Sequence, residues 1–312
     1  MVFRELVARH AVAAYVALTF LVSWGGLLLV GGPAGSTGTA WQTDARLPLM
    51  IIAMLAGPSL AGLLLTGLTG GRDALRGLWH RLTTWHVAVR WYAVALLTAP
   101  TVFAIVHLVL SRRSPGLLPS LGAGVAWRGV LAGAIAALGV GLCEEVGWTG
   151  FATPMLRHRH GVFAAGVLIG VPWGAWHLLT NDVWIVSGFA GTLPPALFII
   201  LNGLALVAGQ LPAYRVLMTW VYDHTGSLLV AVLMHASLAA CTFAVSVTVT
   251  GWAYIAYAFT LGGAWWAVVA LTERRAAIAG LLARYPVTAF YGLAFAISWG
   301  GILLVVGGPR AI

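Results

Sequence analysis

The sequence has no lysine, and charged side chains of any kind make up only 8% of its 312 residues. Eight acidic residues are too few to cover the surface of a water-soluble domain of this length. Apolar residues instead make up 61% of the chain, and its mean hydropathy is +0.94. This balance excludes a soluble globular protein and predicts one that crosses a membrane several times.

Cysteine is scarce as well. Cys143 and Cys241 both lie within apolar segments, at a spacing that matches neither a disulfide framework nor a zinc-binding motif. The HExxH helix of common zinc proteases is also absent. We therefore interpret both cysteines as small buried side chains.

The basic residues are all arginine, and the net charge is +9. Most lie in short segments between apolar runs, where arginine marks the cytoplasmic side of a membrane and not a nucleic-acid surface. With the N-terminus inside, the cytoplasmic set is Arg4, Arg9, Arg72, Arg76, Arg81, Arg90, Arg157, Arg159, Arg215, Arg274, Arg275 and Arg284. Arg112 and Arg113 fall on the other side, against this rule. We predict a multi-pass protein of the cell membrane, with a cytoplasmic N-terminus, lipid around it and no nucleic-acid partner.

Nine apolar runs are long enough for helices that cross a hydrocarbon core of about 30 Å. They cover residues 11–31, 47–68, 88–110, 122–150, 162–180, 194–212, 227–249, 251–271 and 286–307. The sequence therefore predicts an all-α transmembrane bundle of about eight core helices plus an extra C-terminal helix.

This pattern suggests a domain over residues 1–272, whose polar motifs lie within 122–245. A cytoplasmic linker, 273–285, is expected to follow, and then the extra transmembrane helix, 286–312. That last segment resembles residues 11–33, because both carry Ser-Trp-Gly-Gly before an apolar run and Gly-Gly-Pro. We interpret it as the possible start of a second copy.

Two further segments carry local predictions. Gly70 to Arg90 mixes Arg, Trp and His with apolar residues at helical spacing, as an amphipathic helix on the cytoplasmic interface does, and a plain loop is the alternative. In the second span, Gly57-Pro58 is expected to bend or open the helix, because proline removes a backbone hydrogen bond.

Two adjacent carboxylates, Glu144 and Glu145, stand near the end of the fourth apolar run. An acidic side chain within a membrane is expensive unless it faces a wet cavity and finds partners, so such residues point to function. Neighbouring helical residues point about 100° apart, which indicates different jobs for the two acids. The alternative places both just beyond the helix end, among lipid headgroups.

Two histidines, His177 and His235, lie in the middle of other spans. A single membrane histidine is as often a packing residue as a catalyst, but an acidic pair on a third helix favours a shared site. Trp173 lies four residues before His177 and should form an aromatic wall beside it. Other intramembrane polar residues are assigned to helix packing, namely His107, Asn202 and Gln210.

These residues, in this order, resemble the motifs of the CPBP family of intramembrane proteases, which includes the type II CAAX prenyl endopeptidases and lysostaphin-resistance proteins. The family motifs are EExxxR, FxxxH and HxxxN or HxxxD. They correspond here to Glu144-Glu145-x-x-x-Thr149, Trp173-x-x-x-His177 and His235-x-x-x-Ala239.

The resemblance implies that Glu144 is the base that activates a water and that Glu145 supports it. His177 and His235 would hold the water or stabilise the oxyanion. A zinc ion held by Glu144, His177 and His235 is an equally open reading, and a cofactor is thus undecided between zinc and none. The expected substrate pocket is lined by Trp148, Thr149, Trp173 and Ala239.

Three positions depart from the family pattern. Thr149 replaces an arginine that would partner Glu145, and Trp173 replaces phenylalanine. Ala239 replaces the Asn or Asp of the third motif, and Ser237 is a poor substitute because it faces away from His235 on a helix. A lost oxyanion donor would reduce the rate by about 10²–10³.

Two functions follow from these observations. The first is an intramembrane endopeptidase that hydrolyses a peptide bond of a peptide or membrane protein near the cytoplasmic face. The second is a catalytically weak or inactive scaffold or immunity-type protein that binds a partner. The residues leave open the substrate, any role of prenylation and the oligomeric state.

Overall fold

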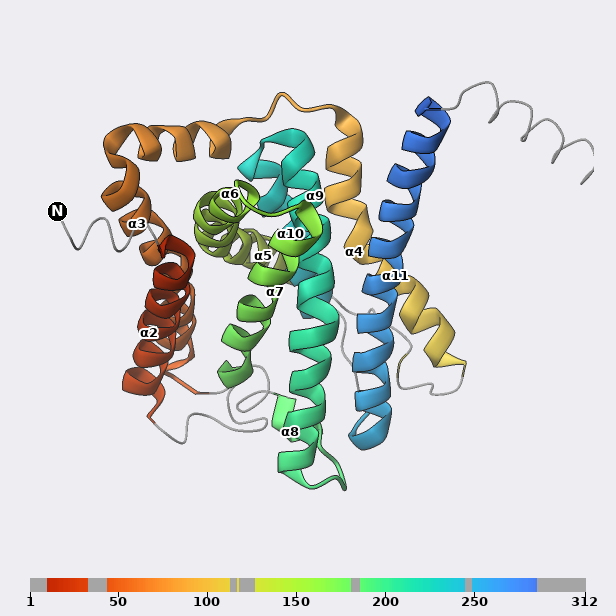
Figure 1. Ribbon diagram of the computed structural model, residues 1–312. Helices are drawn as coiled ribbons and strands as arrows, with labels where there is room; N and C mark the ends of the chain where they lie inside the picture. The colour runs from red at the N-terminus through yellow and green to blue at the C-terminus, as the bar shows by residue number, and fades with distance from the viewer. Residues whose placement is uncertain are drawn as a thin grey trace, which may run out of the picture. The chain divides into compact units, whose positions relative to one another are not determined.

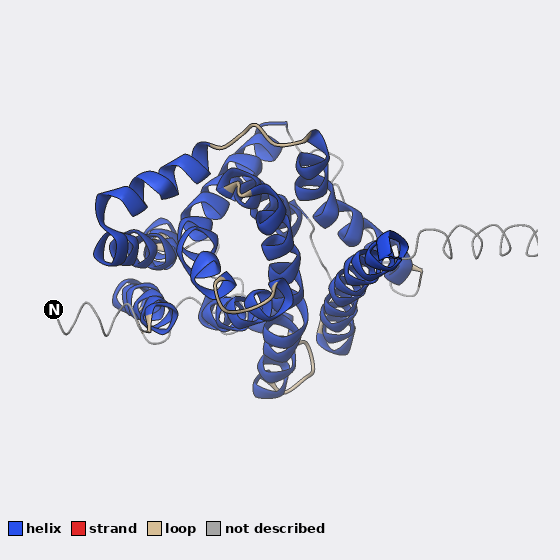
Figure 2. Ribbon diagram, turned by 45° about the horizontal axis from the view of Figure 1, so that its top comes forward, coloured by secondary structure: helices blue, strands red, loops and turns tan. Residues whose placement is uncertain are grey.

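The computed structural model describes residues 10–32, 44–112, 117, 127–180, 186–244 and 249–284. This part of the chain consists of helices and their connections, without a strand (Figures 1 and 2). The predicted all-α transmembrane bundle is thereby confirmed. The ninth predicted span, 286–307, lies outside the described residues, as do Arg4, Arg9 and Arg113.

Ten α-helices are described. They are α2 (Ala11–Gly31), α3 (Leu47–Thr83), α4 (Val89–Ser111), α5 (Trp127–Gly147), α6 (Thr153–Arg157), α7 (Val162–His177), α8 (Pro195–Leu204), α9 (Leu211–Thr225), α10 (Leu228–Ala244) and α11 (Gly251–Arg284). The π-helical segments η3 (Trp148–Ala152) and η6 (Ala205–Gln210) join α5 to α6 and α8 to α9, residues 178–180 after α7 are also π-helical, and η5 (Val186–Phe189) is a short 3₁₀ turn. Within these residues, seven helical segments are long and apolar enough to cross a membrane, and α10 is a shorter apolar helix.

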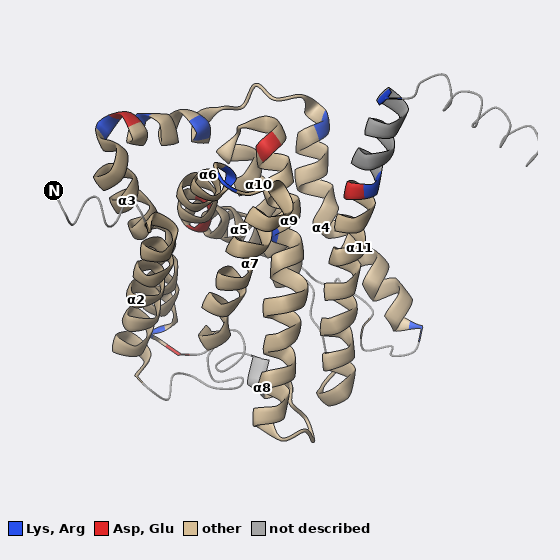
Figure 3. Cartoon of the chain, in the orientation of Figure 1, with Lys and Arg blue, Asp and Glu red and all other residues tan. Residues whose placement is uncertain are grey.

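The chain divides into two compact units, residues 1–266 and 267–312. Within the first unit, α3 packs on α2 and α5, α10 packs on α4 and α5, and α7 packs on α9. The predicted linker, 273–285, is helical as far as Arg284, and the domain boundary at residue 272 stays a prediction. Figure 3 shows charged residues gathered near the helix ends, with long uncharged stretches between them.

Helix α3 changes direction at Gly71, whose φ of 66° no helical residue has. Glycine tolerates this positive φ because it lacks a Cβ. Figure 1 shows the two parts of α3 running in different directions. Residues 72–83 therefore form a separate helical stretch, which confirms the predicted helix over these residues, whereas the prediction is wrong for residues 84–88, which connect α3 to α4 without helical structure.

The predicted opening at Gly57-Pro58 is absent, because the backbone stays helical there. Proline leaves the carbonyl four residues earlier without its helical donor. For Pro58 this is the Met54 carbonyl, which accepts a hydrogen bond of 2.6 Å from the Ser23 hydroxyl on α2. A neighbouring helix thus replaces the missing backbone bond.

Two other carbonyls that lack a helical donor because of a proline also accept hydrogen bonds from side chains. Pro100 leaves the Leu96 carbonyl free, and the Ser237 hydroxyl on α10 donates to it at 2.8 Å. The Ala208 carbonyl, four residues before Pro212, accepts from the indole nitrogen of Trp266 at 3.1 Å. Ser237 therefore faces α4, which agrees with the expectation that it points away from the His235 site.

Ser23→Ala is expected to lower the free energy of unfolding by about 1 kcal/mol, because the Met54 carbonyl would then be buried without a donor. Combined with Pro58→Ala, the same change should have a smaller effect, since the new amide can donate to Met54. Thermal unfolding in detergent measures both. Ser111→Ala is the control, because the Ser111 hydroxyl bonds to its own helix at an exposed site. Equal losses in both backgrounds would contradict this assignment.

Candidate active site

Glycines set the helix crossings that assemble the polar residues. A Cβ on Gly141 of α5 would lie 2.7 Å from the Val232 carbonyl oxygen of α10. A Cβ on Gly170 of α7 would lie 2.4 Å from the Pro212 Cα of α9 and 3.1 Å from the Arg215 Cβ. Only a residue without a side chain lets these backbones approach so closely. As a result, the polar side chains of α5, α7, α9 and α10 meet.

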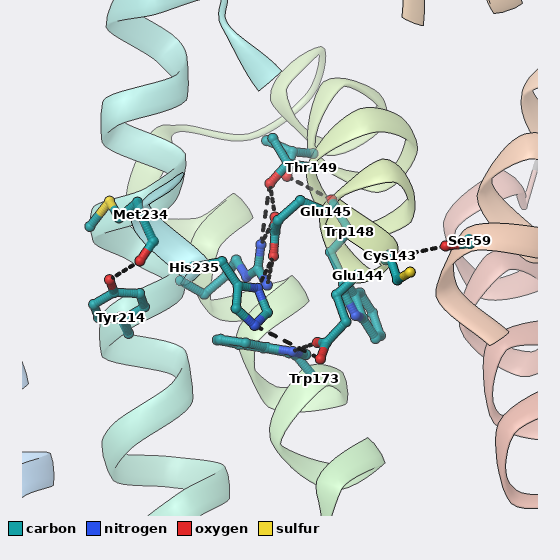
Figure 4. Close-up of polar contacts among 12 residues, drawn as sticks. Ser59, Cys143, Glu144, Glu145, Trp148, Thr149, Trp173, Tyr214, Met234 and His235 are labelled. Atoms are coloured by element: carbon teal, nitrogen blue, oxygen red, sulfur yellow. Dashed lines mark hydrogen bonds and ion pairs between the residues drawn. The ribbon is translucent and has the colours of Figure 1, made fainter. Parts of the chain in front are cut away.

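Glu144 and Glu145 lie inside this assembly, with 2% and 0% of their surfaces exposed. The helix does not end near them, because α5 continues to Gly147 and η3 follows directly. The alternative placement beyond a helix end is therefore wrong. Figure 4 shows the two carboxylates pointing to different partners, as adjacent helical residues should.

Glu145 is held by four donors. The two terminal nitrogens of Arg215 approach its two carboxylate oxygens at 2.7 and 2.9 Å. His235 Nδ1 lies 2.7 Å from Oε1, and the Thr149 hydroxyl donates to Oε2. A carboxylate has about four lone-pair sites, so Glu145 has no capacity left for a water. Its two oxygens are used to hold Arg215, His235 and Thr149.

Arg215 was the residue that sequence reasoning misplaced. Counting charges assigned it to a cytoplasmic loop, but it is fully buried in α9 and pairs with Glu145. Its guanidinium carbon lies 4.1 Å from the centre of the Trp173 ring. Two features of the sequence could have indicated the pairing of Arg215 with Glu145. One is an arginine within an apolar helix, and the other is the missing motif arginine at Thr149.

Glu144 has fewer hydrogen-bond donors around it than Glu145. The indole nitrogen of Trp173 donates to its Oε2 at 2.7 Å. Its Oε1 lies 3.8 Å from His235 Nε2, which is too far for a direct hydrogen bond. Phenylalanine, the family residue at position 173, has no such donor, so this contact was not foreseen.

His235 connects the two carboxylates. Its Nδ1 must carry the hydrogen of the bond to Glu145, because that carboxylate is paired with Arg215 and can only accept. This bond fixes the ring so that Nε2 faces Glu144. A water placed between Nε2 and the Glu144 Oε1 would contact both groups.

His177 lies beside this pair. Its Nδ1 donates to the Trp173 carbonyl at 2.9 Å, since a carbonyl only accepts. Its ring stands edge to face with Trp173 at 5.6 Å and with Trp176 at 4.7 Å between centroids. The aromatic wall expected beside His177 is therefore present.

A cavity of about 580 Å³ opens beside these residues. Glu144, His177, His235, Trp173 and Ala239 line one part of it, and most of the remaining lining is apolar. Glu145 and Arg215 lie behind this wall and do not line the cavity. The apolar part is formed mainly by residues such as Leu27, Met50, Met54, Phe103, Leu206 and Leu261.

Two residues expected in the pocket lie elsewhere. Trp148 does not line the cavity but packs edge to face on Tyr15, with 5.1 Å between ring centroids. Thr149 also lies outside the lining, because its hydroxyl is bound to Glu145. Both belong to η3, whose π-helical bonds change the direction of side chains relative to an α-helix.

The positions of the three expected zinc ligands do not support a zinc site. Among the residues the structure describes, no three His, Cys, Asp or Glu side chains are grouped closely enough to hold a metal ion. Glu144, His177 and His235 share a cavity wall without forming such a group. The residues present therefore do not fit the metal, and no chemical step is assigned to it.

Residues 126–241 match a protein family described as Type II CAAX prenyl endopeptidase Rce1-like. No curated protein matches the chain. The matched segment contains both carboxylates, both histidines, Trp173, Arg215 and Ala239. Residues 126–241, which carry the three motifs, are therefore similar to this family of endopeptidases, as the motifs predicted.

Proposed function

We propose that this protein is an intramembrane endopeptidase that uses Glu144 to activate a water for peptide hydrolysis. The proposal rests on the difference in hydrogen bonding between Glu144 and Glu145. Four donors fill the oxygens of Glu145, whereas Glu144 lines the cavity and presents Oε1 across 3.8 Å to His235. This arrangement leaves Glu144 as the carboxylate able to accept a proton.

The reaction then follows from the positions of these atoms. A water between Glu144 and His235 Nε2 loses a proton to Glu144, and its oxygen bonds to the carbonyl carbon of the substrate. The tetrahedral intermediate collapses when the C–N bond breaks. Glu144 returns its proton to the leaving nitrogen, which restores the carboxylate. His235, fixed by Glu145, orients the water.

The surroundings suit a membrane substrate. The largely apolar lining accepts an apolar stretch of a peptide or membrane protein, while the polar wall receives the bond to be cut. We place the protein in the cell membrane, with its N-terminus in the cytoplasm and cleavage near that face. The arginines and tryptophans of residues 72–90 support this side as the cytoplasmic interface.

Hydrolysis in ¹⁸O-labelled water tests the proposal directly. The purified protein in phospholipid vesicles would be given membrane-associated peptides with and without a prenylated cysteine, because the matched family is described as a CAAX prenyl endopeptidase. One ¹⁸O atom is expected in each new carboxyl group, measured by mass spectrometry. A chelator such as phenanthroline should leave the rate unchanged. Lack of cleavage across both peptide sets, or products without the label, would contradict the proposal.

The scaffold alternative has lost part of its basis. It rested on Thr149 and Ala239, where family residues are missing. Arg215 now supplies the cation that Thr149 lacks. The missing donor at Ala239 is the part of that basis that remains.

A further inference from the structure

We propose that Arg215 has taken over, from a different helix, the role of the arginine in the EExxxR motif. In this chain the motif position is Thr149, and the guanidinium comes from α9. Arg215 is a positioning residue, because it holds Glu145 without lining the cavity. The expected effects on cleavage rest on the proposed function, whereas the expected effects on stability do not.

The first argument is that the two positions reach the same space. Thr149 lies one turn after Glu145, and its hydroxyl bonds to a Glu145 oxygen. Nη1 of Arg215 lies 3.2 Å from that same hydroxyl and 2.7 Å from the same carboxylate oxygen. A guanidinium attached at position 149 would therefore compete for the place that Arg215 fills.

The second argument is burial. Arg215 and Glu145 are both fully buried, and a buried charge without its partner is strongly destabilising. The pair is bidentate, the geometry in which arginine binds a carboxylate most specifically. Loss of the motif arginine would have left Glu145 as an unpaired buried charge unless another cation replaced it.

The third argument is what Arg215 connects. Through Glu145 it fixes His235, whose Nδ1 bonds to the same carboxylate. Its guanidinium also lies 4.1 Å from the ring centre of Trp173, whose indole donates to Glu144. Both groups expected to contact the water therefore depend on a side chain that does not touch it.

The close α7–α9 crossing explains why α9 can supply this group. Gly170 leaves no Cβ between the helices, and a Cβ there would lie 3.1 Å from the Arg215 Cβ. The arginine can therefore extend beneath Trp173 towards α5. A residue with a side chain at position 170 would push Arg215 away from Glu145.

Relocating the arginine tests the inference. Arg215→Met is expected to reduce kcat at least about tenfold with a smaller change in KM, because it disturbs the orientation of the catalytic groups. It should also lower the Tm in detergent. In the double variant Thr149→Arg/Arg215→Met, the guanidinium returns to the motif position, and most of both losses should be recovered. Arg157→Met is the matched control, since its ion pair with Asp223 lies at the protein surface, away from the site.

The outcomes separate the inference from the proposed function. Recovery of Tm in the double variant supports the exchange even where no substrate is cleaved. An Arg215→Met variant with unchanged Tm and rate overturns it. A double variant that melts as low as Arg215→Met, or that cannot be purified when wild type can, also overturns it.

Discussion

Glu144→Gln should lower the rate of peptide hydrolysis by about 10²–10⁴-fold, the usual contribution of a general base. The amide has the same shape as the carboxylate, and its oxygen can still accept the hydrogen bond from Trp173. It cannot take a proton from water at neutral pH. The effect should therefore appear in kcat, with little change in Tm, measured on the protein in vesicles and in detergent.

Glu273→Gln provides the control for this experiment. Glu273 is an exposed acid on α11, far along the chain from the site, and its loss should leave the rate unchanged. A Glu144→Gln protein that is folded and cleaves at the wild-type rate would rule out Glu144 as the base. The assignment of separate roles to the two carboxylates would then have to be abandoned.

Ala239→Asn should raise the cleavage rate, by up to about 10²-fold, if it restores a donor to the oxyanion. Ala239 lines the cavity one helical turn after His235, so an amide at this position would face the same space. The groups already there are poorly suited to donate. In their neutral forms, His177 and His235 carry their hydrogens on Nδ1, bound to Trp173 and Glu145, and Trp173 donates to Glu144.

Four other polar side chains of the cavity are also engaged, whereas the indole nitrogen of Trp176 is buried without a hydrogen-bond partner. The Thr180, Thr242 and Tyr214 hydroxyls and the Gln210 amide each donate to a backbone carbonyl. Thr242→Asn is the control, because it places the same amide elsewhere on the cavity wall. A rise in rate from Ala239→Asn alone would identify the missing donor. No rise, with an unchanged Tm, would show that position 239 does not face the developing charge.

The helices of this protein were predictable from composition and hydropathy. Apolar runs of sufficient length have few alternatives in a membrane, where backbone groups must be satisfied within the helix. For the same reason, the described residues of the first eight predicted spans are helical in the structure, apart from a few at the span ends. The motifs likewise identified Glu144, Glu145, His177 and His235 as candidates, because polar side chains on such helices are rare.

The partners of these residues could not be predicted. Counting arginines treats Arg215 like any loop residue, and its pairing with Glu145 depends on the α7–α9 crossing at Gly170. The direction of Trp148 depends on the π-helical segment η3, which no pattern in the sequence indicated. Both features arise from contacts between distant segments, whereas hydropathy reports only the local environment of each residue.

The donors that serve the proline-freed carbonyls also set an order of assembly during synthesis. Ser23 is translated before Met54, so α2 is already present when α3 enters the bilayer. The Leu96 carbonyl must instead wait for Ser237, 141 residues later in the chain. Until the ribosome has delivered α10, the nascent protein carries a polar backbone group that lipid cannot satisfy. We therefore expect the Leu96 carbonyl to gain its side-chain donor only once α10 packs on α4.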